Sequence, residues 1–509
     1  MSEKQKDKEP TIEKNKETSS YRSIFKATSL FGGVQVYQIL ISIIKAKFIA
    51  ILLGPAGVGI QGLFTSATQL IQGLSSFGLK QSAVKNVSES YSSGDVHKVS
   101  IVVTVLRRLV WLTGLLGMLL VICFSKHLSQ ATFGNNDYVI PFIILSLTLL
   151  LDQLSAGQKV ILQGTRRLKD LAKASALGAT FGLIISVPLY YLLGIKGIVP
   201  TLVLNSVAGL LLSWYFSKRI KIEQVTVNKY IVVKEGKGML QMGIAMSISG
   251  VLVYLSSYVL RSFIRMEGGV DAVGLFTAGF TLMGSYAGLV FTAMATDYYP
   301  RLASVNKDNE KCREIMNQQG EIGILILAPI MCACVIFSTL VIKLLYSASF
   351  YGANSYIIWC ATGMLFKMAS WSVSFVFVAK GESRLFIINE ISSSVYFLGS
   401  YLLGYHIGGL SGLGMSFTVG YILYTIQVYI ISHIRYDFTF SSSFVRLFII
   451  HLIFLIACLT VALVFKSIWE KYIIGSFIFL LSAVYSFKGL DNRIGLMKYI
   501  NTKVEKRNV

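Results

Sequence analysis

Apolar stretches of about 20 residues recur along this chain, and they constrain its fold more than any other feature. A helix of that length spans the hydrocarbon core of a bilayer, where every backbone hydrogen bond must be satisfied within the protein. The sequence therefore predicts an all-α, polytopic membrane protein with about 14 transmembrane helices. The predicted spans are 28–53, 57–79, 105–124, 139–162, 174–193, 197–217, 239–262, 272–298, 319–340, 354–379, 384–405, 409–432, 446–465 and 472–488.

Composition supports this interpretation and excludes others. Hydrophobic residues make up 54% of the chain and charged residues only 14%, whereas soluble domains average about 25% charged residues. The formal net charge of +22 does not indicate nucleic-acid binding, because the cations lie mainly in short loops and form no basic face interleaved with aromatic residues. The six cysteines lack metal-ligand spacing, so neither a metal nor another cofactor is expected.

The distribution of lysine and arginine predicts the orientation in the membrane. Of the 47 basic residues, 36 lie in the two tails and in alternate loops. Because basic residues favour the cytoplasmic side, both termini and these loops are expected in the cytoplasm. The other loops are short. The longest contains FGNNDY (133–138) and leaves no room for a folded extracytoplasmic domain.

One pattern occurs twice in the chain. Lys47 lies 12 positions before Gly59, and Arg261 lies 13 positions before Gly274, with an apolar helix end and a turn in between. We interpret this as a tandem repeat with one inward-facing cation at a corresponding place in each half, a common transporter plan. The expected parts are a disordered cytoplasmic tail (1–20), an N-terminal six-helix lobe (21–217), a cytoplasmic linker (218–236), a C-terminal six-helix lobe (237–432), two further helices (433–488) and a basic cytoplasmic tail (489–509).

Charged side chains inside the spans are candidates for a substrate site. Each costs about 2.5–3.5 kcal/mol on insertion scales, so it usually faces protein or a water-filled cavity. The main candidates are Lys47, Arg261 and Lys367, of which Lys367 lies mid-span, where snorkelling to an interface is hardest. Because lysine and arginine are the usual ligands of phosphate oxygens, these cations predict an anionic, phosphorylated substrate. Secondary cavity candidates are Lys45, Asp152, Lys159 and Glu390.

Structural explanations of the same charges remain open. The lysines at 45, 47 and 159 can snorkel to an interface, and the cations can form salt bridges, for instance with Asp152 or Glu390. Lys45 and Lys47 lie about 200° apart around a helix, so they cannot face the same cavity. The chain has no DxD, HExxH or P-loop motif, and it is not expected to be an enzyme.

An ordered set of motifs links the chain to a family. It resembles the O-antigen and lipid III flippases, within the multidrug/oligosaccharidyl-lipid/polysaccharide exporter superfamily, over residues 21–435. The final two spans depart from the twelve helices common in these flippases. The resemblance is carried by GPAGVG (54–59), FGNNDY (133–138), DYYPRLASV (297–305), the lone Lys367 and VAKGESRLFIINE (378–390).

The resemblance has specific implications for fold and activity. It implies two six-helix lobes around a central cavity, and alternating access. It further implies that an undecaprenyl-diphosphate-linked oligosaccharide, an O-antigen or related surface-glycan repeat unit of the kind found in lipopolysaccharide, moves from the cytoplasmic to the periplasmic leaflet of the bacterial inner membrane. Lys47, Arg261 and Lys367 match basic positions of the family pattern. The predicted partners are this substrate and membrane lipid. A coupling ion or the membrane potential, and glycan polymerases, stay open as further partners.

Two other functions are alternatives to a flippase. A cation-coupled drug exporter of the same superfamily should line its pore with carboxylates, and the excess of lysine and arginine here argues against it. A membrane enzyme of glycan assembly, such as a polymerase or lipid-using glycosyltransferase, would usually need a long catalytic loop, and the sequence has none.

Overall fold

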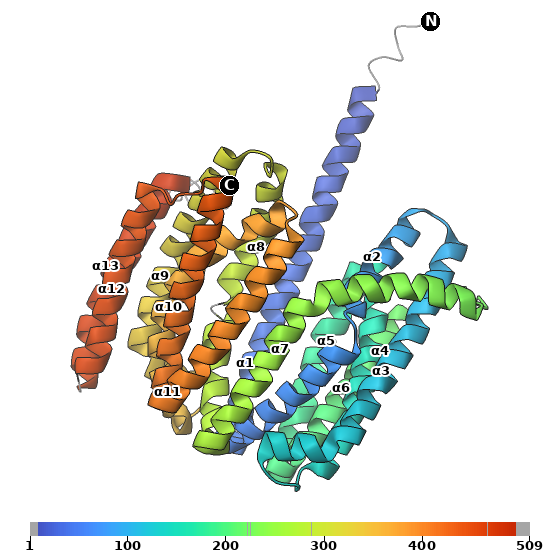
Figure 1. The fold of residues 1–509 in the computed structure, drawn as a ribbon, viewed down its shortest axis with the longest axis horizontal. Helices are drawn as coiled ribbons and strands as arrows, with labels where there is room; N and C mark the ends of the chain where they lie inside the picture. The colour runs from blue at the N-terminus through green and yellow to red at the C-terminus, as the bar shows by residue number, and fades with distance from the viewer. Residues whose placement is uncertain (1–8, 221, 224, 287, 466, 495–509) are drawn as a thin grey trace, which may run out of the picture. The chain divides into compact units, whose positions relative to one another are not determined.

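The computed structural model describes residues 9–220, 222–223, 225–286, 288–465 and 467–494, and helices form most of this part of the chain (Figure 1). Ten helical stretches in it are long and apolar enough to cross a membrane. The chain is therefore an all-α, multi-pass membrane protein, as predicted. The long helices are α1 (Glu9–Ser75), α2 (Leu79–Ser92), α3 (Val96–Phe133), α4 (Val139–Gly164), α5 (Leu168–Leu193), α6 (Ile198–Ser217), α7 (Lys229–Phe280), α8 (Gly288–Ser304), α9 (Asn309–Leu345), α10 (Asn354–Ala379), α11 (Ser383–Tyr436), α12 (Ser442–Val464) and α13 (Ile468–Ile494), with short helical turns at Gly194–Gly197, Thr281–Tyr286 and Ala348–Ala353.

Four of the ten stretches are broken at a glycine. Gly54 (φ 63°, ψ −170°) breaks α1 and Gly269 (φ 77°, ψ 179°) breaks α7. Gly194 (φ 55°, ψ −135°) separates α5 from α6, and Gly409 (φ 54°, ψ −137°) breaks α11. Glycine suits these positions because a side chain disfavours such dihedrals. Each break falls at the boundary between two predicted spans, while the number of membrane crossings stays a prediction.

The backbone repeats itself at an interval of 215 residues. Gly54 corresponds to Gly269 and Gly194 to Gly409, and the dihedral angles within each pair nearly coincide. The turns after α4 and α10 match at the same interval. The Arg167 amide donates to the Leu162 carbonyl (2.8 Å), and the amide at 382 donates to the carbonyl at 377 (2.9 Å). Matching turns therefore recur at this interval although the residues at the matched positions largely differ.

The helix that follows each of these regions begins with a similar cap. The Asp95 carboxylate accepts a 3.0 Å hydrogen bond from the Lys98 amide at the start of α3, and Asp308 accepts one of 3.0 Å from Lys311 at the start of α9. Such caps satisfy one of the unpaired amides of the first helical turn. The bond from the Lys311 amide also lowers the pKa of Asp308 below its ordinary value.

The two helix starts that follow Gly54 and Gly269 cross at glycine. A Cβ atom on Gly59 would lie 2.1 Å from the Val270 carbonyl oxygen, and one on Gly274 would lie 1.9 Å from the Pro55 carbonyl oxygen. Pro55 and Val270 are themselves 215 positions apart, so each repeat presents its glycine to the equivalent carbonyl of the other. This reciprocal contact requires glycine at both positions, because any side chain would clash with the backbone.

The chain divides into two compact units. The first contains residues up to Leu53 together with Phe64–Tyr254, and the second contains Gly54–Leu63 together with the chain from Leu255 onward. The first unit has a core of α2, α3 and α4 side chains, including Leu79, Leu106 and Ile161. The core of the second unit joins α8, α9, α10 and α11. Its fully buried members include Tyr298, Val373, Phe377 and Val428.

The two C-terminal helices belong to the second unit, where α12 and α13 pack on α9 (Figure 1). Polar contacts stabilise this packing. His451 of α12 is fully buried and lies 3.3 Å from Ser482 Oγ and 3.2 Å from Ser486 Oγ, both on α13. Arg493 Nε donates to Glu321 of α9 at 2.8 Å. The predicted helix pair after residue 433 is thus an integral part of its unit.

The two ends of the chain differ in part from expectation. The tail 1–20 is predicted to be disordered, but α1 begins at Glu9. Glutamate and lysine favour helix, and Pro10 is tolerated in a first turn, which accounts for the difference. Residues 1–8 lie outside the described part of the chain. So does most of the predicted basic tail 489–509, from residue 495 on, whereas its first residues extend α13.

Candidate functional site

A cavity of about 340 Å³ in the second unit contains two of the charged residues predicted from the sequence. Lys367 reaches it from α10, and Glu390 reaches it from α11. Aromatic side chains form most of the remaining wall. The lining comprises Lys367, Ser370, Trp371, Ser374, Phe375, Val378, Phe386, Glu390, Tyr421 and Tyr424.

Aromatic rings surround the Lys367 ammonium group. Its Nζ lies 5.1 Å from the centre of the Phe291 ring and 5.5 Å from that of Tyr421. In the described part of the second unit, no carboxylate lies within 4.0 Å of Lys367, and the ion pairs found there do not include Glu390. The predicted alternative, a Lys367–Glu390 salt bridge, is therefore not formed. A cation held by ring quadrupoles stays available to an incoming anion.

Arg261 has a similar environment. Its guanidinium lies 5.4 Å from the Phe276 ring and 5.6 Å from the Phe280 ring, and Nη1 donates to the Ser257 hydroxyl. The Nε–H group is buried and has no acceptor among the described residues. A buried donor without a partner is costly, which makes Arg261 a candidate anion ligand.

A second unpaired group lies near Arg261. The Thr277 hydroxyl is buried and has no hydrogen-bond partner in the described structure. A Cβ atom on Gly62 would lie 3.0 Å from this hydroxyl and 3.8 Å from Arg261 Nε, so both groups face the backbone at Gly62. A Cβ atom at Gly62 would already be tightly packed against Thr277, so these two unsatisfied polar atoms lie close against the backbone there.

The four remaining candidates lie in the first unit and are dispersed. The Lys45 ammonium approaches Gly182 of α5, close to Asn205 of α6. Lys47 is half-buried on the same helix as Lys45. Asp152 lies beside Ser206 of α6, and Lys159 is near enough to Lys80 and Asp152 to interact electrostatically with both. None of the four lines the three cavities described for the chain.

The 215-residue interval between equivalent positions changes the predicted partner of Arg261 and gives Lys367 an equivalent residue in the first half. It aligns Arg261 with Ala46 rather than Lys47, and one residue rotates a side chain by about 100° around a helix. It aligns Asp152 with Lys367, and their neighbours Ser206 and Tyr421 are also 215 positions apart. The two halves thus present opposite charges at an equivalent place.

Comparison with known proteins identifies the family. A model of polysaccharide biosynthesis proteins matches residues 48–354, which is more than half of the chain. The chain belongs to this polysaccharide biosynthesis protein family. The family resemblance drawn from the ordered motifs is therefore confirmed. The match includes Arg261 and the glycine crossing, whereas Lys367 and Glu390 follow it in the sequence.

Curated relatives and solved structures resemble this family member over most of its length. The lipid III flippases of Escherichia coli (strain K12) and Shigella flexneri are each 20% identical over 423 residues, 79% of this chain and 96% of theirs. An inward-facing multidrug resistance MATE family transporter of the MOP superfamily matches with a TM-score of 0.67 and 17% identity, over 79% of this chain and 94% of its own. The lipid II flippase MurJ in an inward closed conformation matches with a TM-score of 0.62 and 14% identity, over 92% and 99%.

The match with MurJ also concerns the C-terminal helices. MurJ leaves 8% of this chain unmatched. This unmatched part has fewer residues than α12 and α13 have together, with 23 residues in α12 and 27 in α13. The shared fold therefore extends into this helix pair, whose presence the family resemblance did not explain.

Several residues of the site were not predicted from the sequence. Trp371, Tyr421, Tyr424 and Phe291 line the cavity or contact Lys367, but aromatic residues are common in membrane helices. A signal was available for Trp371, which follows Lys367 by four positions and so shares its helix face. The residues on α11 offered no such signal, because their approach to Lys367 depends on helix packing.

Proposed function

We propose that this polysaccharide biosynthesis protein is a flippase for an undecaprenyl-diphosphate-linked oligosaccharide, an O-antigen or related surface-glycan repeat unit. It moves this lipid from the cytoplasmic to the periplasmic leaflet of the inner membrane by alternating access. One observation carries the proposal: Arg261 and Lys367 are held against aromatic rings, without a carboxylate partner among the described residues of their unit. The family and the lipid III flippase relatives support the class of substrate.

In this proposal the cations bind the diphosphate. A diphosphate carries at least two negative charges, and two or three cations can neutralise it as it leaves the headgroup region. Cation–π contacts of about 0.5–2 kcal/mol are weaker than a desolvated charge-assisted hydrogen bond, so an arriving phosphate can replace them. Lys47 is retained as the third proposed ligand because it matches a basic position of the family.

The proposed function also requires a defined orientation in the membrane and no catalytic step by this chain. Both termini are cytoplasmic, so a reporter fused at Asn136 should be periplasmic and one at Lys229 cytoplasmic. The opposite pattern would overturn the orientation. The chain acts as a transporter and not as an enzyme. A coupling ion or the membrane potential would drive it, and glycan polymerases would use its product.

Complementation tests the function directly. The chain is expressed in flippase-deficient strains that carry different glycan gene clusters, and surface glycan is scored. Restoration with at least one cluster is expected, and it should require Arg261 and Lys367. Lys311→Ala is the matched control, since Lys311 is an exposed cation that pairs with Asp308. Failure with every cluster despite normal membrane insertion, or full activity of an Arg261→Ala/Lys367→Ala double variant, would contradict the proposal.

One observation favours a second candidate function. The cavity of Lys367 also contains Glu390 and the rings of Trp371, Tyr421 and Tyr424, and carboxylates with aromatic faces suit organic cations. A cation-coupled exporter of an amphipathic drug would use Glu390 in this way. Drug resistance that is abolished by Glu390→Gln but insensitive to Lys367→Ala would favour the exporter.

A further inference from the structure

A separate polar cavity of about 320 Å³ lies in the first unit. Four glutamines contribute to its wall, from three different helices: Gln69 and Gln72 of α1, Gln81 of α2 and Gln153 of α4. Two serines, one lysine and one tyrosine complete its polar lining, at Ser76, Ser247, Lys80 and Tyr254. Among the described residues that form this wall, none is an aspartate or a glutamate.

The polar groups on α1 share one helix face. Gln69, Gln72 and Ser76 follow each other at three and four positions, so their side chains project to the same side. The first two lie inside the predicted span 57–79, where an amide side chain that faced lipid would be costly. Gln153 is buried, and its amide donates a 2.9 Å hydrogen bond to Thr113. These amides therefore contribute to one polar cavity, which is open to the surface at Gln69, Lys80 and Gln81.

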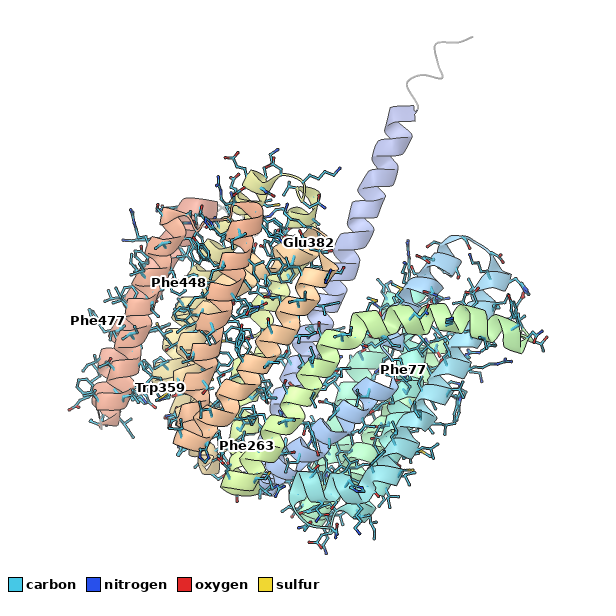
Figure 2. The ribbon with its side chains drawn as sticks, viewed as in Figure 1. Phe77, Phe263, Trp359, Glu382, Phe448 and Phe477 are labelled. Carbon is cyan, nitrogen blue, oxygen red and sulfur yellow. The ribbon has the colours of Figure 1, made fainter. Side chains whose placement is uncertain are left out.

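Glycine contacts bring α7 close enough to form one wall of the cavity. A Cβ atom on Gly78 would lie 2.0 Å from the Gly243 carbonyl oxygen, and one on Gly243 would lie 2.3 Å from the carbonyl oxygen of Phe77, which is labelled in Figure 2. A Cβ atom on Gly73 would lie 2.7 Å from the Tyr254 ring. Any other residue at these positions would push α7 away and open the wall.

The chemistry of the wall indicates the class of ligand. Each amide offers two donors and an acceptor, and each hydroxyl offers both, which matches the alternating hydroxyls of a sugar. Tyr254 adds an apolar ring with a polar end. Among its described lining residues the cavity has neutral polar groups and one lysine, and it lacks the aromatic rings on several sides that mark the cavity of Lys367.

We infer that this cavity is a saccharide subsite, which holds sugar residues of the lipid-linked substrate apart from the cations that hold the diphosphate. The inference rests on the proposed function and adds a second binding region to it. Lys80 and Gln81 begin the segment predicted to be cytoplasmic, so the cavity lies at the end where the sugars are first presented.

The test measures binding of sugar without lipid or diphosphate. The probe is the neutral oligosaccharide released by mild acid from the polyprenyl-diphosphate-linked pool of the producing strain, and saturation-transfer NMR detects it on the purified full-length protein. We expect binding to wild type and at least a tenfold weaker affinity for Gln72→Leu and for Gln69→Leu/Gln72→Leu. Gln163→Leu is the matched control, because Gln163 is an exposed glutamine on α4 outside the cavity.

A second comparison separates the contribution of the Tyr254 ring to saccharide affinity from that of its hydroxyl. Tyr254→Phe should retain more of the affinity than Tyr254→Leu, since it keeps the aromatic face. Elution of every variant as a single species in size-exclusion chromatography shows that it is folded. Absence of saccharide binding by wild type, or equal binding by the Gln72 and Gln163 variants, overturns the subsite.

The arms distinguish this inference from the proposed function. Saccharide binding that depends on Gln72, in a protein that restores no surface glycan, would support the subsite and contradict the flippase. Restored surface glycan with unchanged sugar binding in Gln69→Leu/Gln72→Leu would contradict only the subsite.

Discussion

The middle of α4 and the middle of α10 occupy corresponding places at the 215-residue interval but differ in chemistry. Asp152 on α4 lies beside Ser206, whereas Lys367 on α10, 215 positions later, lies over the Tyr421 ring, 215 positions after Ser206. In α4 a small hydroxyl accompanies a carboxylate, and in α10 aromatic rings accompany an ammonium group. A duplicated fold can thus conserve its turns and crossings while each half acquires its own polarity.

The difference extends to the cavities nearby. Lys367 faces an aromatic cavity in the second unit, and the glutamine-lined cavity of the first unit includes Gln153, the neighbour of Asp152 in the sequence. The two cavities have different lining side chains and therefore suit different ligands. Variants at equivalent positions of the two halves test this difference.

The glycine crossing should be equally sensitive in both halves. Gly59→Leu and Gly274→Leu would each place side-chain atoms on a carbonyl that lies about 2 Å from the Cβ position, so we expect almost no folded protein from either variant. The measurement is the yield of monodisperse protein extracted from membranes. Gly399→Ala is the control, because a Cβ atom there meets nothing within 4 Å. A well-folded Gly274→Leu variant beside an unfolded Gly59→Leu variant would break the reciprocity.

Removing the two equivalent charges should have unequal effects on transport. Lys367→Ala should lower surface glycan by tenfold or more while the protein still inserts, because it removes a proposed ligand of the diphosphate. Asp152→Ala should have a smaller effect, since a carboxylate cannot bind that anion. Quantitative immunoblots of glycan and of membrane-inserted protein give the ratio. A loss with Asp152→Ala as large as that with Lys367→Ala would mean that both charges serve the same step.

Arg261 allows charge and geometry to be separated. Arg261→Ala should lose most transport, whereas Arg261→Lys should retain part of it, because lysine keeps the charge but lacks the planar fork of donors. The same glycan assay applies, normalised to inserted protein. If Arg261 were only structural, the alanine variant would lose inserted protein, and its remaining molecules would transport normally.

Substitutions in the two equivalent glycine turns should lower thermal stability only modestly. Gly194→Ala and Gly409→Ala each force a side chain into dihedrals that favour glycine, at a cost of about 1–3 kcal/mol. Because the two turns have nearly the same angles, the losses in thermal unfolding midpoint should be similar. Differential scanning fluorimetry of the purified variants measures them. Midpoints that fall in only one variant would show that the surroundings, and not the turn, determine the strain.

Local sequence composition was sufficient to predict that this is a helical membrane protein. Long apolar stretches can be satisfied in a bilayer only by helices, and basic residues distribute by side of the membrane, so the helical membrane fold and a predicted orientation follow from local composition. The pairs Lys47–Gly59 and Arg261–Gly274 also revealed a repeat, although the spacing of 12 and 13 positions left its register uncertain by one residue.

The exact register and the cavities depend on tertiary packing. The equivalence of Asp152 with Lys367 emerges from matched turn geometry, because their side chains share no chemistry that a sequence comparison could align. The rings around Lys367 come from α8 and α11 as well as α10, and the glutamines of the first unit come from three helices. Helix periodicity gives the face of each helix, but the neighbour that this face meets depends on packing between residues far apart in the chain.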